Sequence, residues 1–334
     1  ANVRPGNMTL ADLADYHVRI TPPVVSTYRG YTVYGMGLPS SGGLTIALAL
    51  NILEGFDLKA LPREQALHLY LEASRLAFAD RNAYMGDLGF VDVPVAALLS
   101  KAYAQELRKR IGDRAAKGPV APGDPYRFLD DPSPVLRPRG AISSHEGEST
   151  THLTVVDREG NVVSYTFTIE SIGGNGMVVP GYGFLLNNEL TDFDPTPPHP
   201  NAPEAFKRPR SSMSPTLVLK DGQPFLALGS PGGATIITTV LQVLINVIYF
   251  GMPLEEAVAA PRLSQRNLAT TTVEAGFETS PLAKSLEALG HRWTRTGEIG
   301  AVTAVGFAPG GGLIAVAEPT RRGGGSAGVL QPGR

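Results

Sequence analysis

Two threonine hydroxyls near the middle of the chain offer the first chemistry in this sequence. Thr150 opens one predicted strand, Thr168 ends the next, and residues 157–161 between them predict a tight hairpin turn with a glycine at positive φ. If Asp157 faces Asn161 across this turn, Thr150 lies directly opposite Thr168, with Cβ atoms about 5 Å apart. The turn therefore brings the two hydroxyls together.

Alternation along these two strands divides their side chains between two faces. One face carries Leu153, Val155, Val163, Tyr165 and Phe167, and the other carries Thr150, His152, Thr154, Ser164, Thr166 and Thr168. His152 shares the hydroxyl face and is a candidate base for Thr150, but we expect it to be a structural partner of its neighbours. Taken alone, the stretch also fits a half-exposed hairpin whose threonines simply favour strands.

Thr150 acquires a second functional group if the bond between Ser149 and Thr150 is cut. An α-amine with a pKa of about 8 can then act as general base for the hydroxyl of the same residue. Residues 117–149 are rich in Pro and Gly and lack periodicity, and we interpret them as a surface linker that ends at Thr150. The sequence thus predicts a cleavage site and a nucleophile at one residue.

A glycine-rich loop supplies a candidate anion site. Gly229-Ser230-Pro231-Gly232-Gly233 precedes an apolar helix predicted from Ala234, and it matches neither the Walker loop nor the dinucleotide fingerprint. Backbone N–H groups at a helix start suit a carboxylate, a phosphate or a developing oxyanion. The alternative is a tight strand-to-helix turn.

Composition excludes several other functions. The chain of 334 residues has 43% hydrophobic residues and a net charge of −2, and this near-neutral charge does not favour binding to nucleic acid or to an anionic membrane. It has no cysteine, and its histidines are scattered, so we expect no metal and no cofactor. The apolar run 234–250 is too short to span a membrane. Because the chain starts with Ala1, we expect that an upstream piece with any targeting signal has been removed.

Periodicity and turn residues predict hairpins with buried helices between them. The expected helices are 8–19, 44–53, 63–84, 101–111 and the apolar helix from Ala234, and the expected strands are 28–36, 216–220, 224–228, 301–307 and 313–317. This order indicates a layered α+β fold rather than a doubly wound one.

Several motifs occur in the order that is typical of the γ-glutamyltransferase (γ-glutamyltranspeptidase) family. They are Pro39-Ser40-Ser41-Gly42-Gly43, the stretch 79–87 that begins Ala79-Asp80-Arg81-Asn82, Thr150 to Asp157, Asn187 to Phe193, Arg210 to Pro215, and Gly229 to Gly233. The resemblance covers nearly the whole chain. It implies an N-terminal-nucleophile hydrolase with an αββα four-layer sandwich, made as a precursor that cuts itself into large and small subunits.

The resemblance also assigns roles residue by residue. Residues 1–149 would be the C-terminal part of the large-subunit region and residues 150–334 the small-subunit region, forming a heterodimer after cleavage at Ser149–Thr150. The resemblance implies that Thr150 is the nucleophile and that Thr168 hydrogen-bonds to its hydroxyl. Gly232 and Gly233 would be the backbone oxyanion donors. Glu189 and Asp192 would hold the substrate α-amino group, and the hydroxyls of Ser211 and Ser212 would lie near the α-carboxylate.

Three features depart from the family pattern. Glu170 stands where the family usually has Asn, which places a negative charge near the expected substrate carboxylate. The segment from Phe193 to Ser211 is short and rich in proline, so we expect no lid and an open groove similar to that of capsule poly-γ-glutamate depolymerases. The N-terminal part of the usual large subunit, with its carboxylate-binding arginine, is not in this chain, so we expect either that the chain is a fragment or that the role has moved to Arg321 or Arg322. The second alternative is the weaker one, since paired arginines in a Gly-rich tail are usually solvated.

The resemblance implies cleavage of γ-glutamyl amides through an acylated Thr150, with glutathione-like or poly-γ-glutamate donors and water or an amine as acceptor. A glutaryl or cephalosporin acylase of the same fold is a second interpretation. Glu189 and Asp192 argue against it, because such substrates lack the α-amine. An unprocessed binding homologue is a third. The family is commonly exported, so the resemblance implies a secreted or periplasmic location.

Overall fold

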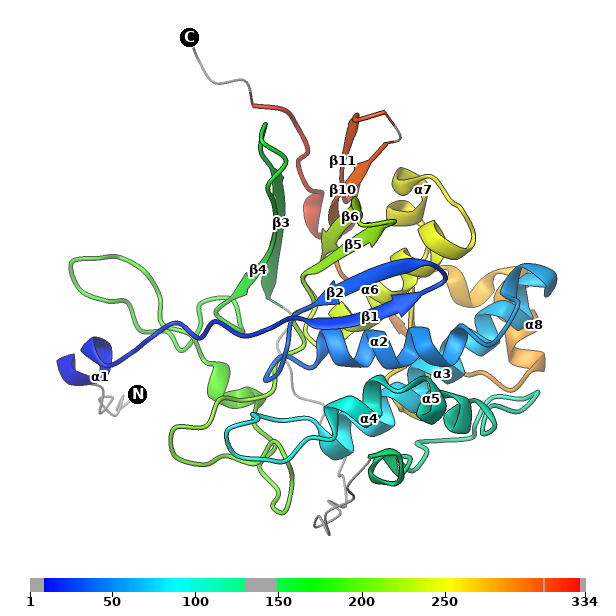
Figure 1. Cartoon of the computed structure of the whole chain (residues 1–334), viewed down its shortest axis with the longest axis horizontal. Helices are drawn as coiled ribbons and strands as arrows, with labels where there is room; N and C mark the ends of the chain where they lie inside the picture. The colour runs from blue at the N-terminus through cyan, green and yellow to red at the C-terminus, as the bar shows by residue number, and fades with distance from the viewer. Residues whose placement is uncertain (1–8, 130–148, 309, 331–334) are drawn as a thin grey trace.

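A six-stranded antiparallel sheet forms the centre of the structure, a computed structural model that describes residues 9–129, 149–308 and 310–330 (Figure 1). Its strands run in the order β1-β2-β5-β6-β10-β11. They are Val24–Tyr28, Tyr31–Gly35, Thr216–Lys220, Gln223–Gly229, Thr303–Phe307 and Leu313–Ala317. Asp221 and Gly222 have φ values of 50° and 75°, so the predicted Asp-Gly hairpin forms as the sequence indicated.

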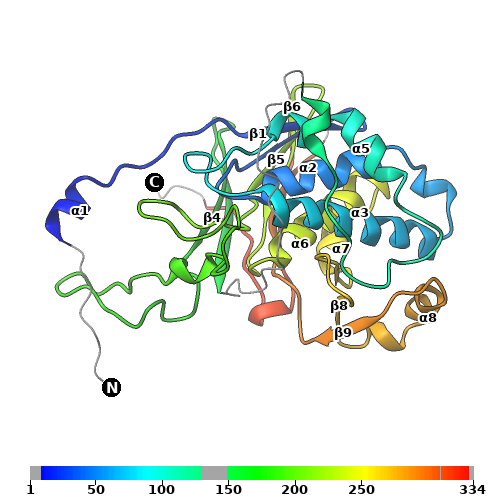
Figure 2. The same cartoon turned by 90° about the horizontal axis from the view of Figure 1, so that it is seen from below.

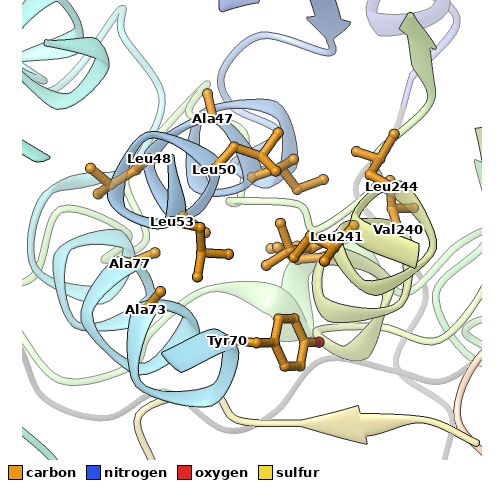
Figure 3. Packing of buried hydrophobic residues seen from close by; sticks show 14 of the residues in the cluster. Ala47, Leu48, Leu50, Leu53, Tyr70, Ala73, Ala77, Val240, Leu241 and Leu244 are labelled. Carbon is orange, nitrogen blue, oxygen red and sulfur yellow. The ribbon is translucent and has the colours of Figure 1, made fainter. Parts of the chain in front are cut away.

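Helices cover one face of this sheet. Those that contact its strands include α2 (Gly42–Leu53) and α6 (Thr235–Leu244), the latter continued by a π-helical turn, Ile245–Tyr249, and α3 (Arg63–Tyr84) packs against α2. Figure 3 shows Leu50 and Leu53 of α2, Tyr70 and Ala73 of α3, and Leu241 of α6 packed together. The helices bury one continuous apolar core against the sheet.

The helix α3 has the predicted bounds, but it is more buried than its amphipathic pattern suggested. Its last turns are covered as well, including Asp80, Arg81 and Asn82. The Tyr103 hydroxyl donates to the Asp80 carboxylate at 2.6 Å, and burial raises the pKa of Asp80 to about 6. These charged residues therefore belong to the interior and not to a solvated face.

The described part of the predicted surface linker, residues 117–129, is fastened to this helix. The Tyr84 hydroxyl donates to the Gly123 carbonyl at 2.6 Å, and Asn267 makes two hydrogen bonds with the Val120 backbone. A short 3₁₀ turn, Pro125–Phe128, follows. Most of residues 117–129 remain at least partly exposed, and the surface-linker interpretation stays a prediction because residues 130–148 lie outside the described residues.

The hairpin of β3 (Thr150–Val156) and β4 (Val162–Thr168) forms with the predicted register, and Thr150 pairs with Thr168. It lies on the face of the main sheet opposite the helices (Figures 1 and 2). Along β6, Leu226 and Leu228 point into the helical core, and Gly229 faces the other way, toward His152. A Cβ at Gly229 would overlap the His152 ring, so glycine is required there.

The hydroxyl face of this hairpin is turned inward. His152 and Thr166 are 6% and 7% exposed, whereas Val155 and Tyr165 on the apolar face are 51% and 50% exposed. The Ser164 hydroxyl donates to the Leu228 carbonyl at 3.0 Å, which ties β4 to β6. Polar side chains thus join the two sheets at this point.

Smaller elements complete the described chain, and some differ from the predicted bounds. The expected strand 28–36 is divided by a turn at Arg29 and Gly30, whose φ values are 50° and 83°, so β1 was missed. The remaining α-helices and strands of the described ranges are α1 (Leu10–Ala14), α4 (Val95–Leu99), α5 (Lys101–Arg108), α7 (Leu254–Ala259), α8 (Pro281–Ala288) and the small sheet of β7 (Leu263–Ser264), β8 (Thr271–Glu274) and β9 (Trp293–Thr296). The α+β class is confirmed. Across the three described ranges, no helix combines the length and the apolar character needed to cross a bilayer.

Candidate active site

One pocket collects most of the residues singled out from the sequence. Its lining consists of Thr150, Thr168, Glu170, Glu189, Asp192, Ser211, Ser212, Met213, Gly233 and Ile236. These residues come from the hairpin, from a 3₁₀ turn, from the segment before β5 and from the start of α6. The fold therefore brings seven of the eight candidate pocket residues together; Gly232 adjoins the pocket beside Gly233 without lining it.

The two threonine hydroxyls are hydrogen-bonded in a chain that includes the predicted cleavage site. Thr150 Oγ1 donates to Thr168 Oγ1 at 3.3 Å, and Thr168 Oγ1 donates to the Ser149 carbonyl oxygen at 2.8 Å. The Glu170 backbone N–H donates to Thr168 Oγ1 at 2.8 Å. A hydroxyl can accept two hydrogen bonds and donate one. Thr168 Oγ1 makes all three, so the direction of each hydrogen bond in this chain is fixed.

Glu170 joins the hairpin to the neighbouring acidic turn. Its backbone has φ 73°, which is uncommon for a residue with a side chain, and this bend directs its N–H at Thr168. Its carboxylate accepts hydrogen bonds from the Ser171 hydroxyl, at 2.5 Å, and from the Asn188 side-chain amide. Glu170, whose negative charge departs from the family pattern, thus lines the pocket and is only 7% exposed.

The acidic residues lie on a 3₁₀ turn, Glu189–Asp192, directly after Asn188. Asn201, which sequence reasoning missed, holds this turn in place. Its side-chain amide donates to the Asp192 carbonyl at 2.7 Å, and its side-chain oxygen accepts from the Arg210 N–H at 2.7 Å. Asn201 therefore spaces the acids from the serines, and no local pattern in the Pro-rich loop signalled this role.

The serine pair rests against two upstream motifs. The Ser41 N–H and hydroxyl both donate to the Ser211 carbonyl at 2.8 Å, and the Ser40 hydroxyl donates to the Met213 carbonyl at 2.5 Å. From α3, Arg81 donates to the Ser212 hydroxyl at 2.7 Å. Segments about 130 and 170 residues away in sequence thus build this wall.

The loop Gly229–Gly233 adopts positive φ angles at its last two glycines. Gly232 and Gly233 have φ values of 138° and 54°, and a Cβ at Gly232 would overlap the Thr235 hydroxyl. The helix α6 begins at Thr235, and the N–H groups of Thr235 and Ile236 donate to the carbonyls of Gly232 and Gly233 at 3.1 Å and 3.0 Å. The Ala301 N–H donates to the Ser230 hydroxyl at 2.9 Å, which anchors the loop to the chain before β10.

His152 is a structural partner, as expected, and not a base for Thr150. Its Nδ1 lies 2.7 Å from Thr166 Oγ1, and its Nε2 lies 3.2 Å from Thr154 Oγ1. Burial lowers the pKa of His152 to about 4, so the ring is neutral near pH 7.

The expectation that Arg321 binds a substrate carboxylate is wrong. Its guanidinium is buried between two carboxylates of the protein, those of Glu274 and Glu318, and it donates to Glu318 at 2.8 Å. Arg262 shares Glu318 at 2.6 Å. A guanidinium enclosed by two acids serves the fold, and Arg322 is absent from the described lining of the pocket.

A family model described as gamma-glutamyltranspeptidase matches residues 1–328. A glutathione hydrolase proenzyme of Bacillus subtilis subsp. natto is 41% identical over 304 residues, which are 90% of this chain and 51% of the relative. An acylase ACY 1 proenzyme of Pseudomonas sp. (strain V22) is 38% identical over 315 residues, which are 93% of this chain and 53% of the relative.

Among solved structures, the cephalosporin acylase from Bacillus halodurans is similar, with a TM-score of 0.83 and 30% identity. The match covers 98% of this chain and 56% of that chain. The chain spans about half the length of the curated relatives that it matches.

The buried neutral His152 predicts a pH dependence of stability. The unfolded chain, with a histidine pKa near 6.5, binds a proton that the folded chain, with a pKa of about 4, does not. The free energy of unfolding should therefore fall as the pH decreases from about 6.5 toward about 4, by at most about 1.4 kcal/mol per pH unit from this group. Urea unfolding across this range, for the wild type and for His152→Gln, measures the effect. The variant should lose stability less steeply, and parallel pH profiles would contradict the assignment.

Proposed function

Because this chain belongs to the gamma-glutamyltranspeptidase family, we propose that it is a self-processing enzyme that cleaves γ-glutamyl amide bonds through an acylated Thr150. The observation that carries this proposal is the position of the Thr168 hydroxyl. It contacts both Thr150 Oγ1 and the carbonyl oxygen of Ser149, at 3.3 Å and 2.8 Å. The Thr168 hydroxyl thus contacts both the attacking oxygen and the carbonyl oxygen of the peptide bond that must break.

Self-cleavage would use this arrangement directly. Thr150 Oγ1 attacks the Ser149 carbonyl carbon, the bond to the Thr150 nitrogen breaks, and that nitrogen takes up the hydroxyl proton. The product is an ester between Ser149 and Thr150 Oγ1, which water hydrolyses to a free carboxylate and a free Thr150 hydroxyl. Thr168, by donating to the Ser149 oxygen, stabilises the negative charge that develops on it.

Turnover would repeat the same chemistry on a bound amide. The released α-amine of Thr150 takes the hydroxyl proton as Oγ1 attacks the γ-carbonyl, and it returns a proton to the leaving amine. The oxyanion would lie at the N–H groups of Gly232 and Gly233, where the start of α6 is positive. Water or an acceptor amine then removes the acyl group from Thr150.

The charges of the pocket support a substrate that carries an ammonium group. Glu189 and Asp192 would hold this group, because two carboxylates around one ammonium give charge-assisted hydrogen bonds. Ser211 and Ser212 would contact the α-carboxylate. Of the described residues 194–209, none lines the pocket, which supports an open groove that accepts a polymeric as well as a small donor.

Processing into two subunits is part of the proposal. The large-subunit region would end at Ser149 and the small-subunit region would begin at Thr150, and the two would remain associated through the interior contacts of α3 with the segment before β5.

Replacing the Thr168 hydroxyl tests the proposed role of that group. Thr168→Val keeps the shape of the side chain but removes the donor to the Ser149 oxygen, so self-cleavage should slow by about 100-fold. Thr168→Ser should cleave at nearly the wild-type rate, and Thr150→Ala should not cleave at all. Intact mass over time gives these rates, and the smaller wild-type piece should begin at Thr150. Cleavage of the Thr150→Ala protein at this bond would refute the mechanism.

A second candidate, an acylase for glutaryl-type side chains, is favoured by the similarity to the cephalosporin acylase structure. Such substrates lack the α-amine that Glu189 and Asp192 would bind. The γ-glutamyl proposal predicts that kcat/KM for a γ-glutamyl anilide exceeds that for the glutaryl anilide by at least about tenfold, and that Asp192→Asn removes most of this preference. A wild-type preference for the glutaryl anilide would favour the acylase. An intact chain that turns over neither compound would indicate a binding homologue without catalysis.

A further inference from the structure

Two hydroxyl groups flank the glycines that the proposed chemistry uses for the oxyanion. Ser230 is fully buried, and Thr235, the first residue of α6, is half-buried. Each hydroxyl donates to a carbonyl of the loop, Ser230 Oγ to the Pro231 oxygen and Thr235 Oγ1 to the Gly232 oxygen, both at 2.7 Å. The proposed turnover gives neither hydroxyl a task.

The two carbonyls belong to the peptide groups that carry the proposed oxyanion donors. The Pro231 carbonyl shares a peptide group with the Gly232 N–H, and the Gly232 carbonyl shares one with the Gly233 N–H. Both peptide groups are trans, so the C=O and N–H bonds of each point in opposite directions. A hydrogen bond that holds the carbonyl therefore also sets the direction of the N–H.

The backbone of this loop does not set these directions by itself. Turning over the peptide group between Gly232 and Gly233 changes ψ of the first glycine and φ of the second, and glycine tolerates both signs of φ. Turning over the preceding group changes ψ of Pro231, which the proline ring leaves free, and φ of Gly232. Either group could thus present its carbonyl oxygen to an oxyanion in place of its N–H.

Ser230 Oγ is confined by the chain that precedes β10. It accepts from the Ala301 N–H at 2.9 Å, and a Cβ on Gly300 would lie only 2.6 Å from it. Because the Ala301 N–H can only donate, the hydrogen of the Ser230 hydroxyl is available for the Pro231 carbonyl. The segment before β10 thereby fixes the first peptide group through Ser230.

Thr235 holds the second peptide group with two donors. Its hydroxyl and its backbone N–H both donate to the Gly232 oxygen, at 2.7 Å and 3.1 Å. A Cβ on Gly232 would lie 2.6 Å from Thr235 Oγ1, so glycine permits this close approach. The N–H bond remains when the hydroxyl is removed, and we therefore expect a smaller effect at Thr235 than at Ser230.

We propose that Ser230 and Thr235 are positioning residues that orient the N–H groups of Gly232 and Gly233 toward the oxyanion. The assignment rests on the proposed function and extends it to two residues that touch no reacting atom. Negative charge develops on the oxyanion in the transition state, so the oriented N–H groups act there and contribute little to substrate binding. Loss of either hydroxyl should therefore lower kcat and leave KM nearly unchanged.

The chain provides a matched control for each residue. The Ser74 hydroxyl, which is also buried, donates to the Gln265 carbonyl at 2.8 Å. The Thr238 hydroxyl, on α6, donates to the Thr235 carbonyl at 3.0 Å, with the same spacing of three residues that Thr235 has to its own acceptor. Ser74→Ala and Thr238→Val thus remove hydrogen bonds of the same kind outside the glycine loop.

The experiment measures kcat and KM for a γ-glutamyl anilide. It also measures inhibition by the glutamate analogue whose γ-carboxyl group is replaced by a boronic acid, because its tetrahedral adduct with Thr150 Oγ1 imitates the transition state. In Ser230→Ala, kcat should fall at least about tenfold, and KM should change less than about threefold. Thr235→Val should lower kcat at least about threefold, and Thr235→Ser should restore it.

The boronic acid should bind each variant more weakly by the factor that is lost in kcat/KM. The two control variants should keep kcat and KM within about twofold of the wild type. Self-cleavage provides a further contrast, because the Ser149 carbonyl oxygen accepts from Thr168 in the uncut chain. Ser230→Ala and Thr235→Val should therefore release the piece that begins at Thr150 at nearly the wild-type rate, and self-cleavage that slows as much as turnover would overturn the assignment.

Three kinetic results would also overturn the proposal: a wild-type kcat in both Ser230→Ala and Thr235→Val, a rise in KM in place of the loss in kcat, or equal losses in the controls. Thr235 is half-buried, so its variants keep the test possible if Ser230→Ala does not fold. A wild type that does not turn over the γ-glutamyl anilide refutes the proposed function. Crystal structures of the two variants then decide the positioning claim, since a turned peptide group supports it and the wild-type orientation of both groups overturns it.

Discussion

The arrangement of this site depends on one hydroxyl with three defined hydrogen bonds. Thr168 accepts from Thr150 and from the Glu170 N–H and donates to Ser149. Its position follows from the register of the β3–β4 hairpin, and the bend at Glu170 supplies the third bond. The register in turn is held by polar contacts of the inward face with β6. A slip of one residue would turn Thr150 and Thr168 to the outer face and separate the nucleophile from its partner.

The remaining walls are joined to this hydroxyl by side chains that span separate segments. Asn188 links Glu170 to the acidic turn, Asn201 links that turn to Arg210, and Arg81 links the serine pair to α3. The contacts of Asn201 and Arg81 are buried and that of Asn188 is partly buried, so the acids, the hydroxyls and the nucleophile keep fixed separations. Such preorganisation is what recognition of an amine and a carboxylate on one small group requires.

Local patterns in the sequence predicted the parts of this structure that local physics determines. The turn at residues 157–161 set the pairing of Thr150 with Thr168, and three-to-four spacing gave α3 its exact bounds. Contacts between distant segments could not be predicted in this way. The burial of Arg321 depends on Glu274, 47 residues away in the chain. Asn201 bridges Asp192 and Arg210, each nine residues away, across a Pro-rich loop that has no periodicity to predict the contact. The sequence also did not predict that the hydroxyl face of the hairpin is the buried one, because the alternation of side chains is the same whichever face is buried.

The central claim is that Thr150 carries the acyl group. Rapid quenching of the purified protein with a γ-glutamyl ester, followed by digestion and peptide mass mapping, tests it most directly. The account predicts one glutamyl group, attached through an ester to the hydroxyl of an N-terminal Thr150. A glutamyl group on another residue, or acylation of a chain whose Ser149–Thr150 bond is intact, would contradict it.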